Sequence, residues 1–279
     1  MQDQSEINVF FTNAVDLKAF FSKCLSEARA QACPKIASIS VPFNYLAPLA
    51  VLQSVGKVNQ LHFYSERPAE DSAVLAWGSV RYATFSGEKR FEEVRAFSEK
   101  CLKSVLRYCA PRGKPFDRPH FFTAFTFEDT PIADLEFAPA TVFLPEWHIF
   151  SDSGTYGLVL NIEVSEGASV DQLYARFEKV YRYFLSFDYA EEKLDTIEQD
   201  SIKDLAEENS SDRPSFEDSV EAALKEIEAN HYQKIVLAQK RVFKNTSGLR
   251  GTDCLDRLRE QFSACHTFSF SDGSDKVFI

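Results

Sequence analysis

Three runs of β-type residues follow one another in the middle of the chain, and they constrain the fold more than any other feature of the sequence. They cover residues 120–129, 140–150 and 155–165, and they are rich in aromatic and β-branched residues. Turn-forming residues separate the runs, and short turns of this kind join antiparallel strands. The pattern therefore predicts an antiparallel meander, which needs a covering layer on at least one face.

Helical periodicity in other parts of the chain supplies that layer. Apolar residues recur at helical spacing, and Ser215 followed by Asp218 forms a capping box before one of these stretches. The predicted helices cover residues 14–32, 88–109, 169–187, 216–230 and 252–263. Together with the β-type runs they predict the α+β class, with antiparallel sheets flanked by helices.

Further strands are expected on both sides of the meander. A strand over 35–41 is predicted to end at Pro42, and the runs 60–68 and 72–87 resemble a hairpin. Gly78 interrupts the second of these runs, which indicates a bulge or a close approach of two backbones. The last β-type residues, 266–279, flank the turn signal "SDGSD".

Composition excludes several classes of protein. The chain has 279 residues, a formal net charge of −11 and no apolar run of the roughly 18 residues that a membrane span needs. Residues 191–230 hold 14 Asp or Glu and 4 Lys or Arg, so nearly all of the net charge lies there. Nucleic-acid binding is therefore not expected, and neither is a membrane-bound protein. The N-terminus lacks the features of a signal peptide, which predicts a cytoplasmic location.

Neither a standard metal motif nor a standard phosphate-binding loop occurs in the sequence. The six cysteines form no CxxC pair and no zinc-type cluster with histidine, so we expect them to be reduced and mostly buried. A P-loop and a GxGxxG motif are both missing. The sequence gives no support for nucleotide binding.

The segment 208–215, "ENSSDRPS", is the clearest candidate for a hinge. It lies within the acidic stretch and is rich in turn-forming residues. We expect an N-terminal lobe over 1–207 and a second region over 216–279 that begins a catalytic domain.

A lysine at the start of the apolar run in "HYQKIVLAQKRVF", residues 231–243, is the main candidate for chemistry. Ile235 to Ala238 place apolar side chains on both faces, as expected for a strand covered on both sides. Lys234 would then enter the protein interior at the first position of this strand. The pattern alone favours a plainer interpretation, in which the lysine reaches solvent along its aliphatic stem.

A family resemblance shifts this balance. The capped acidic helix, "HYQKIVLAQKRVF" and "HTFSFSDGSDKVFI" follow one another as at the start of the catalytic region of chorismate-utilising enzymes. The stretches "FYSERP" (63–68), "AWGSVRYATFSG" (76–87), "FEEV" (91–94) and "APATVFLPEW" (138–147) resemble the N-terminal half of isochorismate synthases. The resemblance implies a partial version of the layered chorismate-binding α/β sandwich.

Within that family, the residue at the position of Lys234 separates two chemistries. Enzymes that add an amino group typically carry Gln there, whereas isochorismate and salicylate synthases carry Lys. The resemblance implies that Lys234, in its neutral form, takes a proton from the water that attacks C2 of chorismate while the C4 hydroxyl leaves. Burial favours the neutral form of a lysine, so this role calls for a buried side chain.

The resemblance also implies groups that the 279 residues do not contain. In the family, a general-acid glutamate, the Mg²⁺ ligands and most contacts to the substrate carboxylates follow this lysine, so we expect them beyond Ile279. The chain would then be an N-terminal portion, truncated before these segments. The resemblance implies chorismate as substrate, Mg²⁺ as cofactor, a monomer at full length, and a product used for menaquinone, siderophores or salicylate.

Two alternatives to an isochorismate synthase remain open. Salicylate synthase shares the lysine and adds a step that eliminates pyruvate. The 279 residues could also be a non-catalytic partial domain that acts only through interactions, because a terminal strand near Ile279 would present an unpaired edge.

Overall fold

The computed structural model describes residues 14–55, 60–109, 118–131, 137–187, 206–207, 215–238, 243–244, 251–274 and 276–279. The chain divides into two compact units. The first unit comprises residues 1–193 and 251–279, and the second comprises residues 194–250. The C-terminal segment therefore belongs to the same unit as the N-terminal half.

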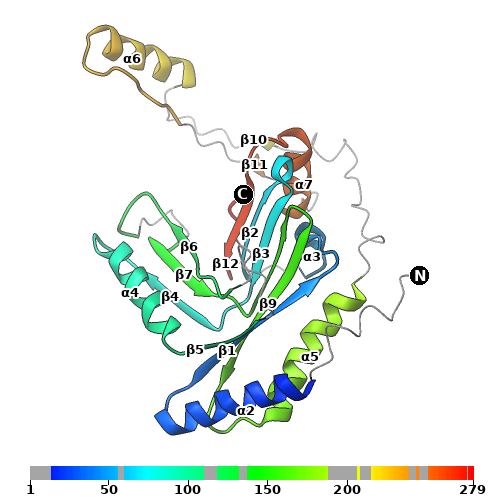
Figure 1. Cartoon of the computed structure of the whole chain (residues 1–279). Coiled ribbons are helices and arrows are strands. Elements are labelled where there is room, and N and C mark those ends of the chain that lie inside the picture. Colours follow the sequence, from blue (N-terminus) through cyan, green and yellow to red (C-terminus); the bar gives the residue numbers. More distant parts are fainter. Residues whose placement is uncertain are drawn as a thin grey trace. The chain divides into compact units, whose positions relative to one another are not determined.

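A mixed sheet forms the centre of the first unit (Figure 1). In the described chain its strand order is β12-β2-β3-β8-β9-β1-β5, and neighbours are antiparallel except for β1 and β5, which are parallel. The strands are β1 (Lys35–Phe43), β2 (Leu61–Arg67), β3 (Ser72–Trp77), β5 (Val105–Cys109), β8 (Trp147–Asp152), β9 (Thr155–Val164) and β12 (Thr267–Asp272).

A smaller antiparallel sheet has the order β4-β7-β6. Its strands are β4 (Arg81–Phe85), β6 (Phe122–Phe125) and β7 (Ala140–Leu144). The chain crosses from the large sheet to the small one between β3 and β4, and it returns between β7 and β8. The two crossings lie side by side, because the Glu146 N–H donates to the Trp77 carbonyl at 3.0 Å.

Helices cover one face of the large sheet. They are α2 (Ala14–Gln31), α3 (Pro48–Val55), α5 (Val170–Ser186) and α7 (Gly251–Gln261). Each contributes to the main apolar core, for example through Phe21, Leu52, Phe177 and Leu255, which are at most 2% exposed. Burying one such large apolar side chain contributes about 1.5–3 kcal/mol, so this layer is a principal source of stability.

The opposite face of the large sheet packs against the small sheet. Phe122 and Phe143 of the small sheet form a core cluster with Val74 and Phe270 of the large sheet. The far side of the small sheet packs against α4 (Arg90–Leu102), where Val94 contacts Val142 in a third cluster. The first unit is thus layered as helices, large sheet, small sheet and helix.

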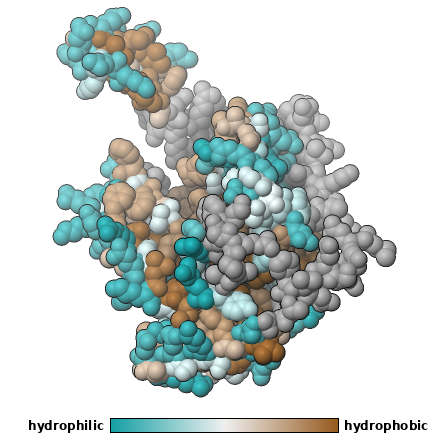
Figure 2. All heavy atoms as spheres, viewed as in Figure 1, coloured by the Kyte–Doolittle hydropathy of each residue, from teal (hydrophilic) through white to brown (hydrophobic). Residues whose placement is uncertain are grey.

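The second unit contains few described elements. Helix α6 (Phe216–Glu228) begins with the predicted capping box, in which the Ser215 hydroxyl accepts from the Asp218 N–H at 3.0 Å. None of its residues is buried, and Figure 2 shows its hydrophobic side chains gathered toward one side of the helix. Two short strands, β10 (Ala206–Glu207) and β11 (Phe243–Lys244), pair with each other.

The predicted α+β fold class is confirmed, including most of the elements. The helices predicted over 14–32 and 169–187 are α2 and α5, and the hairpin predicted over 60–87 begins with the antiparallel pair β2 and β3. Gly78 does mark a close approach, since a Cβ at this position would lie 3.0 Å from the Glu146 side chain.

The predicted end of the first strand at Pro42 is wrong. Strand β1 continues to Phe43, and Pro42 lies opposite Gly157 of β9. Proline is tolerated there because the parallel neighbour β5 ends opposite Ser40, so among the described residues β1 has a ladder on one side only at this point.

The helix predicted over 88–109 is too long. Helix α4 ends at Leu102, and residues 105–109 form β5, which pairs in parallel with β1. The predicted antiparallel sheets therefore include this one parallel pair, which the sequence did not indicate.

The prediction that the cysteines are mostly buried is only partly correct. Cys24 and Cys101 are buried, Cys254 is intermediate, and Cys33 and Cys265 are exposed. The Cys109 side chain lies outside the described part of the structure, as does most of the predicted hinge at 208–215. The boundary proposed there stays a prediction.

Candidate functional site

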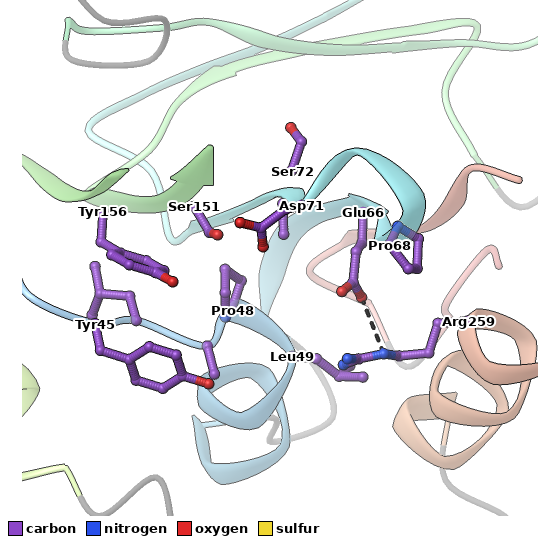
Figure 3. A pocket seen from close by; sticks show the side chains of 13 residues that line it. Tyr45, Pro48, Leu49, Glu66, Pro68, Asp71, Ser72, Ser151, Tyr156 and Arg259 are labelled. Carbon is purple, nitrogen blue, oxygen red and sulfur yellow. Dashed lines mark ion pairs between the residues drawn. The ribbon is translucent and has the colours of Figure 1, made fainter. Parts of the chain in front are cut away.

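A cavity of about 200 Å³ lies in the first unit where two hairpin turns of the large sheet meet (Figure 3). One turn joins β2 to β3 through a short 3₁₀ helix, η1 (Pro68–Glu70), and the other joins β8 to β9. The start of α3 and one side of α7 complete the wall. The lining residues are Tyr45, Leu46, Ala47, Pro48, Leu49, Glu66, Pro68, Asp71, Ser72, Ala73, Ser151, Tyr156 and Arg259.

An ion pair connects the wall of the cavity to helix α7. The Arg259 Nε lies 3.5 Å from Oε2 of Glu66, and this same oxygen accepts a hydrogen bond from the Tyr64 hydroxyl. Tyr64 is fully buried, and burial, followed by the charge of Glu66, raises the pKa of its hydroxyl. The carboxylate of Glu66 therefore faces a hydroxyl that remains protonated.

Helix α7 carries further acidic groups close to this pair. Burial, followed by the charge of Glu260, raises the pKa of Asp256, and Arg259 opposes the shift. Leu255 anchors the helix in the main core at 1% exposure. The α7 side of the cavity is therefore held by one buried apolar anchor and by the Glu66 ion pair.

Asp71 holds the two hairpin turns together. Its backbone has φ +47°, its carbonyl accepts from the Ser153 N–H at 2.9 Å, and its Oδ2 accepts from the Gly154 N–H at 3.0 Å. A left-handed backbone is uncommon for residues other than glycine, but Asp and Asn adopt it more readily than most. The floor of the cavity is thus fixed from both hairpins.

Two tyrosines form the apolar end of the cavity. The rings of Tyr45 and Tyr156 have centroids 5.3 Å apart at an interplanar angle of 57°. Burial, followed by the charges of Asp71 and Tyr45, raises the pKa of Tyr156. The aromatic pair and the carboxylates of Glu66 and Asp71 thus line the same cavity.

The described residues do not provide a metal site. Nowhere in that part of the chain do three or more His, Cys, Asp or Glu side chains gather as possible ligands. The donor set of the cavity, two carboxylates of which one is paired with an arginine, does not fit Mg²⁺, which requires several oxygen ligands in octahedral geometry.

Lys234 belongs to the second unit, whereas the elements that form the cavity wall belong to the first. Residues 231–238 belong to no helix or strand, and both Lys234 and Val236 are exposed. The prediction of a buried strand at this position is therefore wrong for the structure. The physical reason is that no strand of the described second unit pairs with residues 234–238 and no layer covers them. The role of Lys234 stays a prediction.

Sequence reasoning did not single out the residues that line the cavity. Glu66 and Pro68 lie in "FYSERP", a stretch that predicts one strand of a hairpin and carries part of the family resemblance. The available signal was a run of charged and turn-forming residues, "ERPAEDS", between two apolar strands. Such a run predicts a hairpin turn and gives no indication of a cavity beside it.

Comparison with known proteins identifies the family. The family model described as chorismate binding enzyme matches residues 21–279. The chain belongs to this family. No curated protein matches the chain. Within the residues that the structure describes, no helix of this chorismate-binding family member has the length and apolar character needed to cross a membrane.

Among solved structures, the chain is similar to MenF, the menaquinone-specific isochorismate synthase from Escherichia coli. The TM-score is 0.50 and the sequence identity is 14%, and the match covers 90% of this chain. It covers 53% of MenF, so the chain spans about half the length of that protein. At this identity the likeness shows a shared fold, which agrees with the layered α+β architecture.

Proposed function

We propose that the chain is part of an isochorismate synthase, which converts chorismate to isochorismate. The observation that carries the proposal is the family match over residues 21–279. The likeness to MenF, which is an isochorismate synthase, supports the choice within the family. The lysine in "HYQKIVLAQK" gives further support, because amino-adding relatives typically carry Gln at that position.

The proposed reaction exchanges one hydroxyl for another. The oxygen of water forms a bond to C2 of chorismate, the ring double bonds shift, and the C4–oxygen bond breaks. Neutral Lys234 takes one proton from the attacking water, and a general acid gives one proton to the departing hydroxyl. A positioned base and acid of this kind each contribute about 10²–10⁴-fold to the rate.

For this role the Lys234 side chain has to be more shielded from solvent than it is in the described structure. Its side chain is exposed, whereas a lysine that takes a proton from water has to be in its neutral form. We infer that bound substrate and the protein segments of a MenF-length polypeptide would cover Lys234 and so favour its neutral form. The general acid and the Mg²⁺ ligands are also proposed to lie in those segments.

Product analysis tests this function. The longest polypeptide encoded by the reading frame of these 279 residues is incubated with chorismate, with MgCl₂ or with EDTA, and the products are separated by chromatography. Isochorismate that forms only with Mg²⁺ would support the proposal. Salicylate together with pyruvate would identify a salicylate synthase instead. Chorismate that stays unchanged under both conditions would remove the enzymatic proposal and favour a non-catalytic interaction domain.

A further inference from the structure

The charge of the cavity beside η1 argues against chorismate as its ligand. Glu66 and Asp71 contribute two carboxylates, while Arg259 contributes one guanidinium, which is already paired with Glu66. The lining therefore has a formal charge of −1. Chorismate carries two carboxylates, and a dianion in a negatively charged cavity is disfavoured by repulsion and by the loss of its hydration.

Two oxygen atoms at the polar end of the cavity have no partner among the described residues. The Asp71 Oδ2 is bonded to Gly154, but no described group donates to its Oδ1. Ser151 is 7% exposed, lines the cavity, and its Oγ makes no hydrogen bond within the described chain. Figure 3 shows both side chains directed into the same space. Both side chains line the cavity, so both oxygen atoms can accept a hydrogen bond from a molecule bound there.

The opposite end of the cavity offers aromatic and apolar surface. Tyr45 and Tyr156 contact each other there, and Pro48 lies beside them (Figure 3). Tyrosine rings present a large, rigid and mostly apolar surface, against which the apolar body of a ligand can pack. The cavity thus combines a negative polar end with an aromatic end.

We propose that this cavity binds a small organic molecule with a primary ammonium group and an apolar body. The ammonium group donates to Asp71 Oδ1 and Ser151 Oγ, and the apolar body packs against Tyr45, Tyr156 and Pro48. An ammonium group has three donors and no acceptor, which matches two acceptor oxygens beside a net negative charge. This site does not depend on the proposed isochorismate synthase activity.

Matched probes test the charge requirement on the 279-residue chain. Benzylamine, benzyl alcohol and benzoate have nearly the same body and carry a positive, neutral and negative head group. Titration calorimetry at low salt should show benzylamine binding at least about tenfold more tightly than benzyl alcohol, because it gains charged hydrogen bonds. Benzoate should show no saturable binding. Phenylalanine extends the series, and tighter binding than benzylamine would identify an amino acid as the source of the ammonium group.

Substitutions of residues that line the cavity test whether benzylamine binds there. Asp71→Asn keeps an acceptor for Gly154 but removes the charge, so it should weaken benzylamine binding by about tenfold. Ser151→Ala should weaken it less, since it removes one neutral acceptor. The control is Glu70→Gln, which removes a negative charge from the same turn at a residue that pairs with Arg67 and does not line the cavity. This control should bind benzylamine as the unaltered chain does.

Three results would overturn the proposal. They are equal affinity for benzylamine and benzyl alcohol, equal weakening by Asp71→Asn and Glu70→Gln, and no saturable binding of benzylamine by a chain whose circular dichroism shows it to be folded. Chorismate consumption by the longer polypeptide is measured separately, so loss of either proposal leaves the other intact.

Discussion

The Oδ2 of Asp71 accepts a hydrogen bond from the backbone N–H of Gly154 at 3.0 Å, which ties the β2–β3 turn to the β8–β9 turn. The backbone of Asp71 adds a second link, because its carbonyl accepts from the Ser153 N–H at 2.9 Å. Both contacts lie at the edge of the cavity beside η1. One residue thus supports the hairpin ends and contributes a carboxylate to the cavity.

Substitution of Asp71 should therefore lower stability in a graded way. Asp71→Ala removes the side-chain acceptor and places alanine at φ +47°, so we expect a loss of about 1–3 kcal/mol in the free energy of unfolding. Asp71→Asn retains an acceptor and a residue suited to this backbone, so its loss should stay below about 1 kcal/mol. Urea denaturation of both variants measures the difference. Equal losses would show that neither the hydrogen bond nor the backbone conformation matters.

Gly157 leaves no room for a side chain. A Cβ at this position of β9 would lie 2.6 Å from the ring of Phe150 on the neighbouring strand. Gly157→Ala forces the Phe150 ring to move within a packed layer, which should cost about 1–3 kcal/mol in the free energy of unfolding.

Gly167 provides the matched control. A Cβ there would meet nothing within 4 Å, so Gly167→Ala should be neutral or slightly stabilising through the unfolded state. Urea titrations of the two variants are compared at equal protein concentration. A Gly157→Ala variant as stable as Gly167→Ala would contradict the packing that the structure gives for β8 and β9.

His62 should make the stability of the first unit depend on pH. Its Nδ1 donates to the Gln60 carbonyl at 3.0 Å, so its Nε2 is the acceptor for the Ser269 hydroxyl, also at 3.0 Å. Burial lowers the pKa of His62, and the bond to Gln60 only partly offsets this. Protonation in the folded state would remove the acceptor that links β2 to β12.

The sign follows from the lowered pKa. The unfolded chain takes up a proton on this histidine as the pH falls through about 6.5, before the folded chain does, so stability is full above that pH and declines below it. The slope from this one group is at most about 1.4 kcal/mol per pH unit. Stability curves between pH 7.5 and 5 should be flatter for His62→Gln than for the unaltered chain. Parallel curves would exclude His62 as the source.

Local patterns in the sequence predicted the parts of the fold that depend on local interactions. The capping box of Ser215 and Asp218 and the hairpin of β2 and β3 formed as predicted, because each is specified by residues close together in the chain. Strand β5 was missed since "VLRYC" continues the periodicity of α4. Only its pairing with the distant β1 makes it a strand, and tertiary contacts of this kind override local propensity.

The cavity could not be predicted for the same reason. Glu66 and Arg259 come together because β12 pairs with β2, which brings the preceding helix α7 beside the β2–β3 turn. In the sequence, Ser151 cannot be distinguished from any other strand residue, and only the folded structure shows that it lines the cavity. The family resemblance correctly predicted the family and the fold. It could not predict the surroundings of Lys234, because the burial of a side chain depends on contacts with residues outside its own segment of the sequence.

The final prediction concerns Lys234 itself. Lys234→Ala should lower the turnover of chorismate by at least about 100-fold in the longest polypeptide of the reading frame, because the attacking water loses its base. The stability of the 279-residue chain with the same substitution should stay within about 0.5 kcal/mol of the unaltered chain, since the Lys234 side chain is exposed in this structure. Lys225→Ala is the control, because Lys225 is an exposed lysine of helix α6 in the same unit, and its activity should be unchanged. Full turnover by Lys234→Ala, measured as loss of chorismate with Mg²⁺ present, would remove this lysine from the mechanism and leave the base to be sought elsewhere in the protein.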